Sequence, residues 1–275
     1  MTEAFAAWVE RDVIRAQGPD TLTFLQGQLS QDLESMATDE SRWSLLLAPT
    51  GKVDAWLRVT RSADDEFVLD TDGGWGDAVI ARLQRFKLRT KCDIEPVDGW
   101  RCLAVRGTTV ADPAARPIAW PGVVGVDLLG ADVAPPPDVP MVDLYERLRI
   151  ESGVPAMGRE LTESMIPVDA GQWLIDASVS FTKGCYTGQE LVARIDSRGG
   201  NAPHPVRGLR VPGRVDVGAT VTSVEGRALG ELTSVSFIED RGETVALAPL
   251  ARVVEPPADV LVAATAARLV ELPMR

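Results

Sequence analysis

A change of pattern near residue 200 constrains the fold of this chain more than any other feature. After the Pro- and Gly-rich stretch 199–205 (GGNAPHP), short strand-like runs alternate with Gly-containing turns. This alternation is typical of a small all-β barrel. Before the stretch, helical and strand patterns are mixed. We therefore expect a domain boundary here, followed by a β-barrel domain over 201–275.

The segment before this boundary contains several helical and strand patterns. Leu22, Leu25, Leu29 and Leu33 recur at helical spacing and predict an amphipathic helix. The elements predicted after it are strands over 43–48, 53–60 and 66–70, a helix over 75–90, and strands over 93–97, 101–106 and 123–129. The first six of these elements, in the order β-β-β-α-β-β, resemble a ferredoxin-like unit with an extra strand.

A proline-rich stretch and a further helix follow that unit. Pro135, Pro136 and Pro137 mark a stiff linker. After the linker, apolar residues from Met141 to Leu148 predict a helix that ends near Gly153.

Charge and composition exclude several classes of protein. The net charge of −12 disfavours nucleic-acid binding and membrane-surface binding, since both partners are anionic. No apolar run reaches the roughly 20 residues of a membrane span, and Met1 to Arg11 lack the basic start of a signal peptide. The three cysteines are an odd, sparse set typical of reduced thiols, so we expect a cytoplasmic protein.

The chain has a single histidine, His204, between two prolines. A Ser–His–Asp or Cys–His mechanism would have to use this residue, and a His-rich zinc site is excluded. Three scattered cysteines cannot supply the four thiolates of a self-contained iron–sulfur cluster. We therefore predict no metal site within the chain.

Residues 180–199 (SFTKGCYTGQELVARIDSRG) contain the strongest candidate for chemistry. They place Cys185 beside Lys183 and just before a helix predicted from about Thr187 to Asp196. A neighbouring cation and a helix N-terminus both favour a thiolate, which indicates a reactive or coordinating cysteine with Lys183 as its partner. A small buried cysteine is the alternative, and these physical arguments alone leave both open.

The run Lys183-Gly184-Cys185-Tyr186-x-Gly188-Gln189-Glu190 resembles the K-G-C-[FY]-x-G-Q-E signature of the YgfZ family. Mitochondrial relatives of that family assist the maturation of [4Fe–4S] proteins. The resemblance covers most of the chain, including 18–33, 48–52 (APTGK), 147–161 (RLRIESGVPAMGREL), 230–234 (GELTS) and 246–249 (ALAP). The R-x-E-x-G stretch within 147–161 is shared with glycine-cleavage T-proteins.

This resemblance implies an α+β protein built as a three-domain ring of the T-protein/YgfZ type. Its domains would be a discontinuous folate-binding domain over 1–41 and 131–200, a ferredoxin-like middle domain over 42–130, and a C-terminal small β-barrel over 201–275. Tetrahydrofolate, or a derivative, would enter a central channel.

A folate site needs a carboxylate for the pterin, apolar walls and a cation for the glutamate tail. The resemblance matches Glu151 to the pterin-binding glutamate of T-proteins, although a water-facing residue at a helix end is the plainer interpretation. For the tail, Arg194, Arg198 and Arg207 remain open. The other candidate contacts are Trp173, Trp56 and Leu25 as walls, and Tyr186 and Gln189 from the signature.

The chain departs from the T-protein pattern at one position. T-proteins carry an aspartate, on the strand after the turn, that helps steer one-carbon transfer. An ungapped comparison places Trp56 there, with Asp54 two residues earlier on the same strand face. A missing or displaced acid argues against aminomethyl transfer.

We therefore expect a monomeric, cytoplasmic tetrahydrofolate-binding accessory protein for the assembly or repair of iron–sulfur proteins, and not a conventional enzyme. Cys185 would be its functional thiol, and its partners would be folate and iron–sulfur client or assembly proteins. Two alternatives are a folate-dependent aminomethyl or methyl transferase that uses Asp54, and a scaffold that binds proteins through the basic helix over 75–91.

Overall fold

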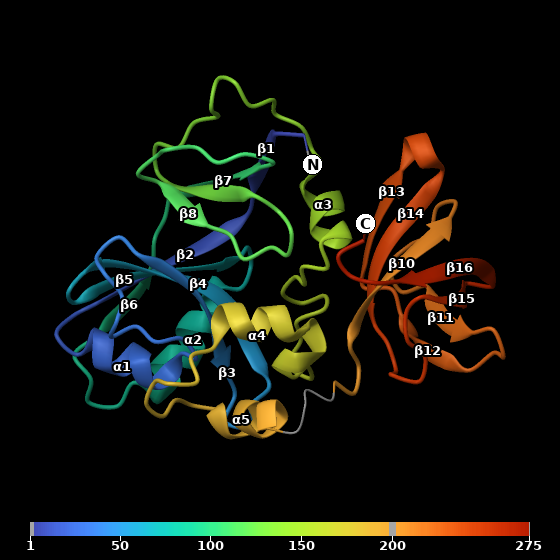
Figure 1. Cartoon of the computed structure of the whole chain (residues 1–275). Helices are drawn as coiled ribbons and strands as arrows, with labels where there is room; N and C mark the ends of the chain where they lie inside the picture. The colour runs from blue at the N-terminus through green and yellow to red at the C-terminus, as the bar shows by residue number, and fades with distance from the viewer. Residues whose placement is uncertain (1–2, 198–201, 275) are drawn as a thin grey trace.

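The computed structural model describes residues 3–197 and 202–274, which form three antiparallel sheets and several short helices (Figure 1). The sheets have five, four and seven strands. The first two lie together in one half of the molecule, and the third forms the other half (Figure 1).

The five-stranded sheet has the order β3-β4-β5-β2-β6. Its strands are β2 (Arg11–Gln17), β3 (Ser41–Leu47), β4 (Val53–Ala63), β5 (Glu66–Asp72) and β6 (Asp93–Pro96). Helices α1 (Thr21–Gln28), α2 (Gly76–Phe86) and α4 (Gln172–Ser178) cover one face of it (Figure 1). Their apolar side chains join those of the sheet in the largest hydrophobic core.

The four-stranded sheet has the order β1-β7-β9-β8. Its strands are β1 (Phe5–Val9), β7 (Arg101–Arg106), β8 (Ala115–Pro117) and β9 (Gly125–Gly130). The strands of 42–130, expected in one ferredoxin-like unit, are thus divided between two sheets, and each sheet takes a strand from the N-terminal segment. The reason is that β1 and β2 are separated only by Glu10 yet pair with different partners. The domain limits given above remain a prediction.

Buried charges join these two sheets. Arg58 on β4 donates to Asp70 on β5 and to Asp127 on β9, and Arg106 on β7 donates to the other oxygen of Asp127. All four side chains are buried. Because each charge faces an opposite one, the arrangement avoids the cost of an unpaired buried ion.

The seven-stranded sheet has the order β12-β11-β15-β16-β10-β14-β13. Its strands are β10 (Val206–Pro212), β11 (Thr220–Ser223), β12 (Ala228–Glu231), β13 (Ser234–Ile238), β14 (Glu243–Pro249), β15 (Ala258–Val262) and β16 (Thr265–Val270), with the 3-10 turn η2 (Glu239–Arg241) before β14. A bridge between Gly230 and Leu250 brings the β12 edge back to the end of β14 around a separate apolar core. This curved sheet agrees with the predicted small barrel.

Four helix limits differ from the prediction. Helix α2 ends at Phe86 and not at residue 90, since Lys87 has left the helical conformation. Helix α1 ends at Gln28, because Leu29 is extended and the chain folds back so that Leu33 donates its backbone N–H to the side chain of Gln26. Helix α3 (Tyr145–Glu151) starts later than expected, because Met141 is held in a strand-like bridge to Ala6. Helix α5 (Gln189–Ser197) starts two residues late, and η1 (Pro167–Ala170) precedes α4.

Candidate functional site

Lys183 anchors the loop that carries the signature. Its ammonium donates to three backbone carbonyl oxygens, those of Gln26 at 2.7 Å, Leu29 at 2.6 Å and Gln31 at 2.9 Å. These oxygens belong to the end of α1 and the turn after it, where helical carbonyls lack partners within the helix. Burial lowers the pKa of Lys183 to about 8, so the group is still charged at pH 7. All three ammonium protons are therefore used to hold the loop.

The rest of the signature is fixed by close backbone contacts. Thr187 donates its N–H to the carbonyl of Gly27, and Gly188 has a φ of +81°. A Cβ on Gly188 would lie 2.5 Å from the carbonyl oxygen of Ala48, in the APTGK turn. Only glycine permits both this conformation and this approach. Two segments of the family resemblance, about 140 residues apart in sequence, thus pack against each other.

Tyr186 and Gln189 complete this packing and do not reach a cavity of their own. The Gln189 side-chain oxygen accepts the backbone N–H of Tyr186 at 3.1 Å. Tyr186 is buried, which raises its pKa to about 12, and its phenol therefore stays neutral at pH 7. Both residues brace the loop in this structure.

Cys185 is the exposed cysteine on this braced loop, whereas Cys92 and Cys102 are buried. Desolvation raises the pKa of both buried thiols. The two charges expected beside Cys185 are directed elsewhere: Lys183 faces the end of α1, and α5 begins only at Gln189. Exposure on a fixed loop, and not a neighbouring cation, is what distinguishes Cys185.

Asp54 forms an ion pair in this structure. Its carboxylate accepts from Arg82 Nε at 2.8 Å, and Arg82 also donates to the carbonyl of Leu47. Trp56 stacks on Trp43 at 4.2 Å between ring centroids, donates its indole N–H to Ser178, and meets Trp173 edge-on at 5.9 Å. Trp56 and Leu25 are buried in the core and are not walls of the cavity described next.

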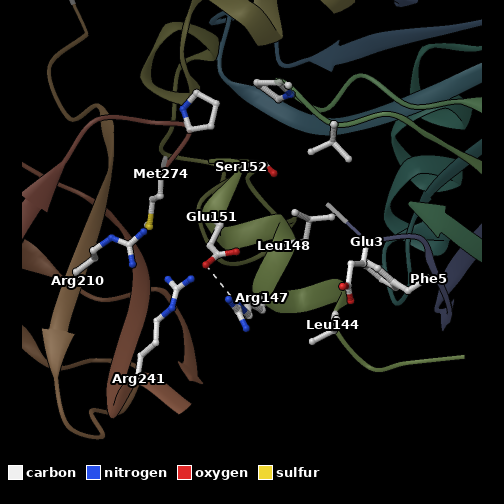
Figure 2. Close-up of a pocket in the computed structure, with 14 residues that line it drawn as sticks. Glu3, Phe5, Leu144, Arg147, Leu148, Glu151, Ser152, Arg210, Arg241 and Met274 are labelled. Atoms are coloured by element: carbon white, nitrogen blue, oxygen red, sulfur yellow. Dashed lines mark hydrogen bonds and ion pairs between the residues drawn. The ribbon is translucent and has the colours of Figure 1, made fainter. Parts of the chain in front are cut away.

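A cavity of about 690 Å³ lies beside Glu151, between α3 and the barrel (Figure 2). Leu144 and Leu148 of α3, Phe5 of β1 and Met274 of the C-terminal segment supply apolar walls. The backbone N–H of Met274 donates to the carbonyl of Glu151 at 2.6 Å, which ties that segment to the end of α3. This volume is in the range of about 300–1,000 Å³ typical of small-molecule sites.

Three arginines line this cavity together with Glu151. Arg147, on the same helix, lies 3.4 Å from the Glu151 carboxylate, and Arg210 and Arg241 approach from the barrel (Figure 2). Glu3 also lines the cavity, and Glu243 on β14 pairs with Arg210 at 2.7 Å and with Arg241 at 3.5 Å. An anionic ligand would therefore exchange with Glu243 for the two barrel arginines.

Of the predicted folate contacts, Glu151 alone lines this cavity among the residues that the structure describes. Arg207 pairs with Glu255 instead. Arg198 lies outside the described residues, as does the side chain of Arg194. Sequence reasoning missed Arg210 and Arg241, because single arginines in barrel strands and turns carry no pattern that links them to α3.

A buried polar junction holds α3 against the barrel beside the cavity. Arg149 Nη1 lies 3.3 Å from Glu160, and Arg149 also donates to Ser234 Oγ at 2.6 Å. The hydroxyls of Thr233 and Ser234 donate to the other Glu160 oxygen. Two further segments of the resemblance, 147–161 and 230–234, therefore meet here and fix the two sides of the cavity.

Other classes of site have no support in 3–197 and 202–274. These residues contain no group of three or more His, Cys, Asp or Glu side chains placed to hold a metal ion. They also form no helix long and apolar enough to cross a membrane. The backbone N–H of His204 donates to Asp169.

Comparison with known proteins identifies the fold. No protein-family model matches the chain. Its structure resembles the glycine cleavage system aminomethyltransferase T from Bartonella henselae, with a TM-score of 0.78 and 21% identity over 99% of this chain and 86% of that chain. The chain thus has the T-protein fold, as the sequence predicts.

Sequence relatives narrow this class. The chain is 28% identical to the tRNA-modifying protein YgfZ of Vibrio vulnificus over 275 residues, covering 89% of this chain and 83% of that protein. It is also 28% identical to the mitochondrial iron–sulfur cluster assembly factor IBA57 homolog of Pyricularia oryzae, covering 72% of this chain and 55% of that protein. These relatives and the T-protein fold together support assigning the chain to the YgfZ family of T-protein-like proteins.

Proposed function

We propose that this chain is a tetrahydrofolate-binding accessory protein for iron–sulfur proteins, with folate beside Glu151 and Cys185 as the thiol that meets a partner. The observation that carries the proposal is the exposure of Cys185 on a loop braced by Lys183 and Gly188, while the other two thiols are buried. The relatives named for iron–sulfur cluster assembly and for tRNA modification support this role.

The chemistry of the cavity supports a folate. The Glu151 carboxylate can accept the N–H donors of a pterin edge, and Leu144, Leu148 and Phe5 can cover the apolar linker. Arg210 and Arg241 would supply planar donors for the carboxylates of a glutamate tail, in exchange for their present partner Glu243.

The single exposed thiol limits what Cys185 can do. One thiolate supplies one ligand, whereas an iron–sulfur cluster requires four. We therefore expect no stable cluster in the isolated chain, which we take to be a monomer. Cys185 would act only against the cysteines of a partner protein.

The alternative, a folate-dependent aminomethyl or methyl transferase, has weaker support. Its acid would be Asp54, whose carboxylate is paired with Arg82 and does not line the Glu151 cavity. A role in tRNA modification would be indirect, because a protein of net charge −12 is repelled by the phosphate backbone.

Calorimetric titration with tetrahydrofolate tests the ligand. We expect one site per chain and an affinity about tenfold lower in Glu151→Gln, because an unpaired buried donor costs about 1–3 kcal/mol. Arg268→Ala, on the barrel and away from the cavity lining, is the matched control. Equal affinities for the two variants would remove Glu151 from the site.

A deletion strain tests the cellular role. Activity of [4Fe–4S] enzymes should fall in the strain, recover with the wild-type gene, and not recover with Cys185→Ser. Full recovery with that variant would contradict the role of the thiol. Formation of 5,10-methylene-tetrahydrofolate from an aminomethyl donor would favour the transferase instead.

A further inference from the structure

The segment 85–91, which comprises the last two residues of α2 and the turn after it and is here called the basic loop, combines exposed cations with exposed apolar side chains. Leu88 is 81% exposed and Phe86 is 36% exposed. Arg85, Arg89 and Lys91 lie among them and are exposed as well. A single exposed leucine is common on protein surfaces. Here, however, Leu88 lies among three exposed cations within seven residues, and such a mixed apolar and charged surface is of the kind found at protein interfaces.

Internal contacts hold the basic loop in a fixed shape. The Lys87 ammonium donates to the carbonyl of Cys92 at 2.6 Å, and the Lys91 N–H donates to the Asp20 carboxylate at 2.8 Å. Arg89 has a φ of +54°, a conformation that a residue other than glycine keeps only when its surroundings enforce it. Leu88 is thus presented to solvent by a defined structure.

The three exposed cations of the basic loop form no ion pair within the part of the chain that the structure describes. Among the described residues, no carboxylate forms a salt bridge with Arg85, Arg89 or Lys91, although Arg82 on the same helix pairs with Asp54. Asp93, just beyond the loop, is exposed and joins none of them. An unneutralised positive patch on a chain of net charge −12 attracts an acidic surface and steers its approach.

Helix α2, which leads into this patch, is linked to the loop of Cys185 through α1. Arg82 Nη1 on α2 donates to the Gln28 side chain at 3.3 Å, and the preceding residue, Gly27, accepts the N–H of Thr187. Helix α2 and the Cys185 loop therefore rest on the same end of α1. A partner seated on the basic loop would have its neighbouring surface near Cys185.

We propose that the basic loop docks a segment of the iron–sulfur partner protein that carries carboxylates and aliphatic side chains. This inference rests on the function proposed above and adds the chemistry of its partner. A protein segment fits better than RNA, because Leu88 needs an apolar contact and the guanidinium of Arg82 covers the Phe86 ring at 3.9 Å. That ring therefore has no free face on that side for a base to stack upon.

The test is fluorescence anisotropy with a labelled short peptide of glutamates and leucines, and separately with a labelled tRNA. The variant is Arg85→Glu with Arg89→Glu. The control is Arg214→Glu with Arg268→Glu, which changes net charge equally on exposed barrel residues. We expect at least tenfold weaker peptide binding for the loop variant, a change below twofold for the control, and affinity that falls with added salt.

Equal losses in the two variants would overturn the proposal, since binding would then follow net charge alone. Tight tRNA binding that only the loop variant abolishes would also overturn it in favour of RNA. In the deletion strain, the loop variant should fail to restore [4Fe–4S] enzymes while binding tetrahydrofolate normally. If the wild-type gene does not restore them, the proposed function fails, and the peptide measurement still decides the docking site.

Discussion

Arg149 Nη1 and Glu160 Oε2 lie 3.3 Å apart where α3 meets the barrel, with their side chains 5% and 0% exposed. Both residues also contact the hydroxyl of Ser234 on β13. Arg149 also donates to the Glu146 carboxylate at 2.8 Å. Both charges of the pair are therefore neutralised by protein groups. The junction fixes α3, and with it Glu151, relative to the arginines of the barrel.

Breaking this pair should destabilise the protein strongly. Arg149→Met leaves the buried Glu160 carboxylate without its cation, and we expect it to lower the free energy of unfolding by about 3–5 kcal/mol. Glu160→Leu should cost less, because Arg149 keeps its ion pair with Glu146. The double variant should lose much less than the sum. Urea denaturation followed by tryptophan fluorescence measures all three, and additive losses would show that the two residues do not interact.

Lys183 and Cys185 should differ in what they contribute. Lys183→Met leaves three backbone carbonyls without their ammonium donor, and we expect the free energy of unfolding to fall by about 2–3 kcal/mol. Cys185→Ser changes an exposed side chain and should stay within about 0.5 kcal/mol of wild type. Thermal and urea denaturation check both. If Lys183→Met is as stable as wild type, the structural role of Lys183 is wrong and a chemical role beside Cys185 is favoured instead.

The three cysteines should react in a fixed order. Cys185 is exposed, whereas burial raises the pKa of Cys92 and Cys102 and shields both from reagent. Brief treatment of the folded protein with iodoacetamide at pH 7, followed by mass spectrometry, should find the label on Cys185. The same treatment in urea should label all three. Early labelling of Cys92 in the folded protein would contradict this order.

Acid should weaken the contact between the first two sheets. Burial alone would raise the pKa of Asp127, but Arg106 and Arg58 outweigh it and hold the pKa below its ordinary value of 3.8. A lowered pKa in the folded state stabilises the fold above about pH 4, and that contribution is lost as pH falls further. Asp127→Asn lacks the charge at every pH. Its free energy of unfolding should therefore be about 3 kcal/mol lower than that of wild type at pH 7. This difference should shrink as the pH falls toward 3, where the wild type begins to lose the same charge.

Urea midpoints at pH 7, 5 and 3 measure this difference. Glu95→Gln, which removes an exposed charge paired with Arg15, is the matched control and should differ little from wild type at any of them. A deficit of Asp127→Asn that stays constant from pH 7 to pH 3 would exclude Asp127 as its cause.

Much of the architecture could be predicted from local patterns. Apolar residues at helical or alternating spacing located α2, β4, β5 and β10, because side-chain periodicity reports directly which face of an element is buried. The Gly- and Pro-rich stretch near residue 200 located the start of the barrel for the same local reason. The signature around Cys185 pointed to the family, and its Gly188 is required by a close backbone contact that leaves little choice of residue.

The sequence alone determined the kinds of element, the barrel and the position of the candidate thiol. The tertiary structure decided that Cys185 is exposed and which residues meet. The division of β1 and β2 between two sheets depends on pairing with strands far along the chain, and no local pattern encodes that choice. We expected Lys183 to act beside the thiol. It instead binds carbonyl groups at the end of α1, which have no partner within the helix and lie beside Lys183 only in the folded chain. Arg210 and Arg241 line the same cavity as Glu151 only because the barrel packs against α3. No pattern in the sequence links these three residues.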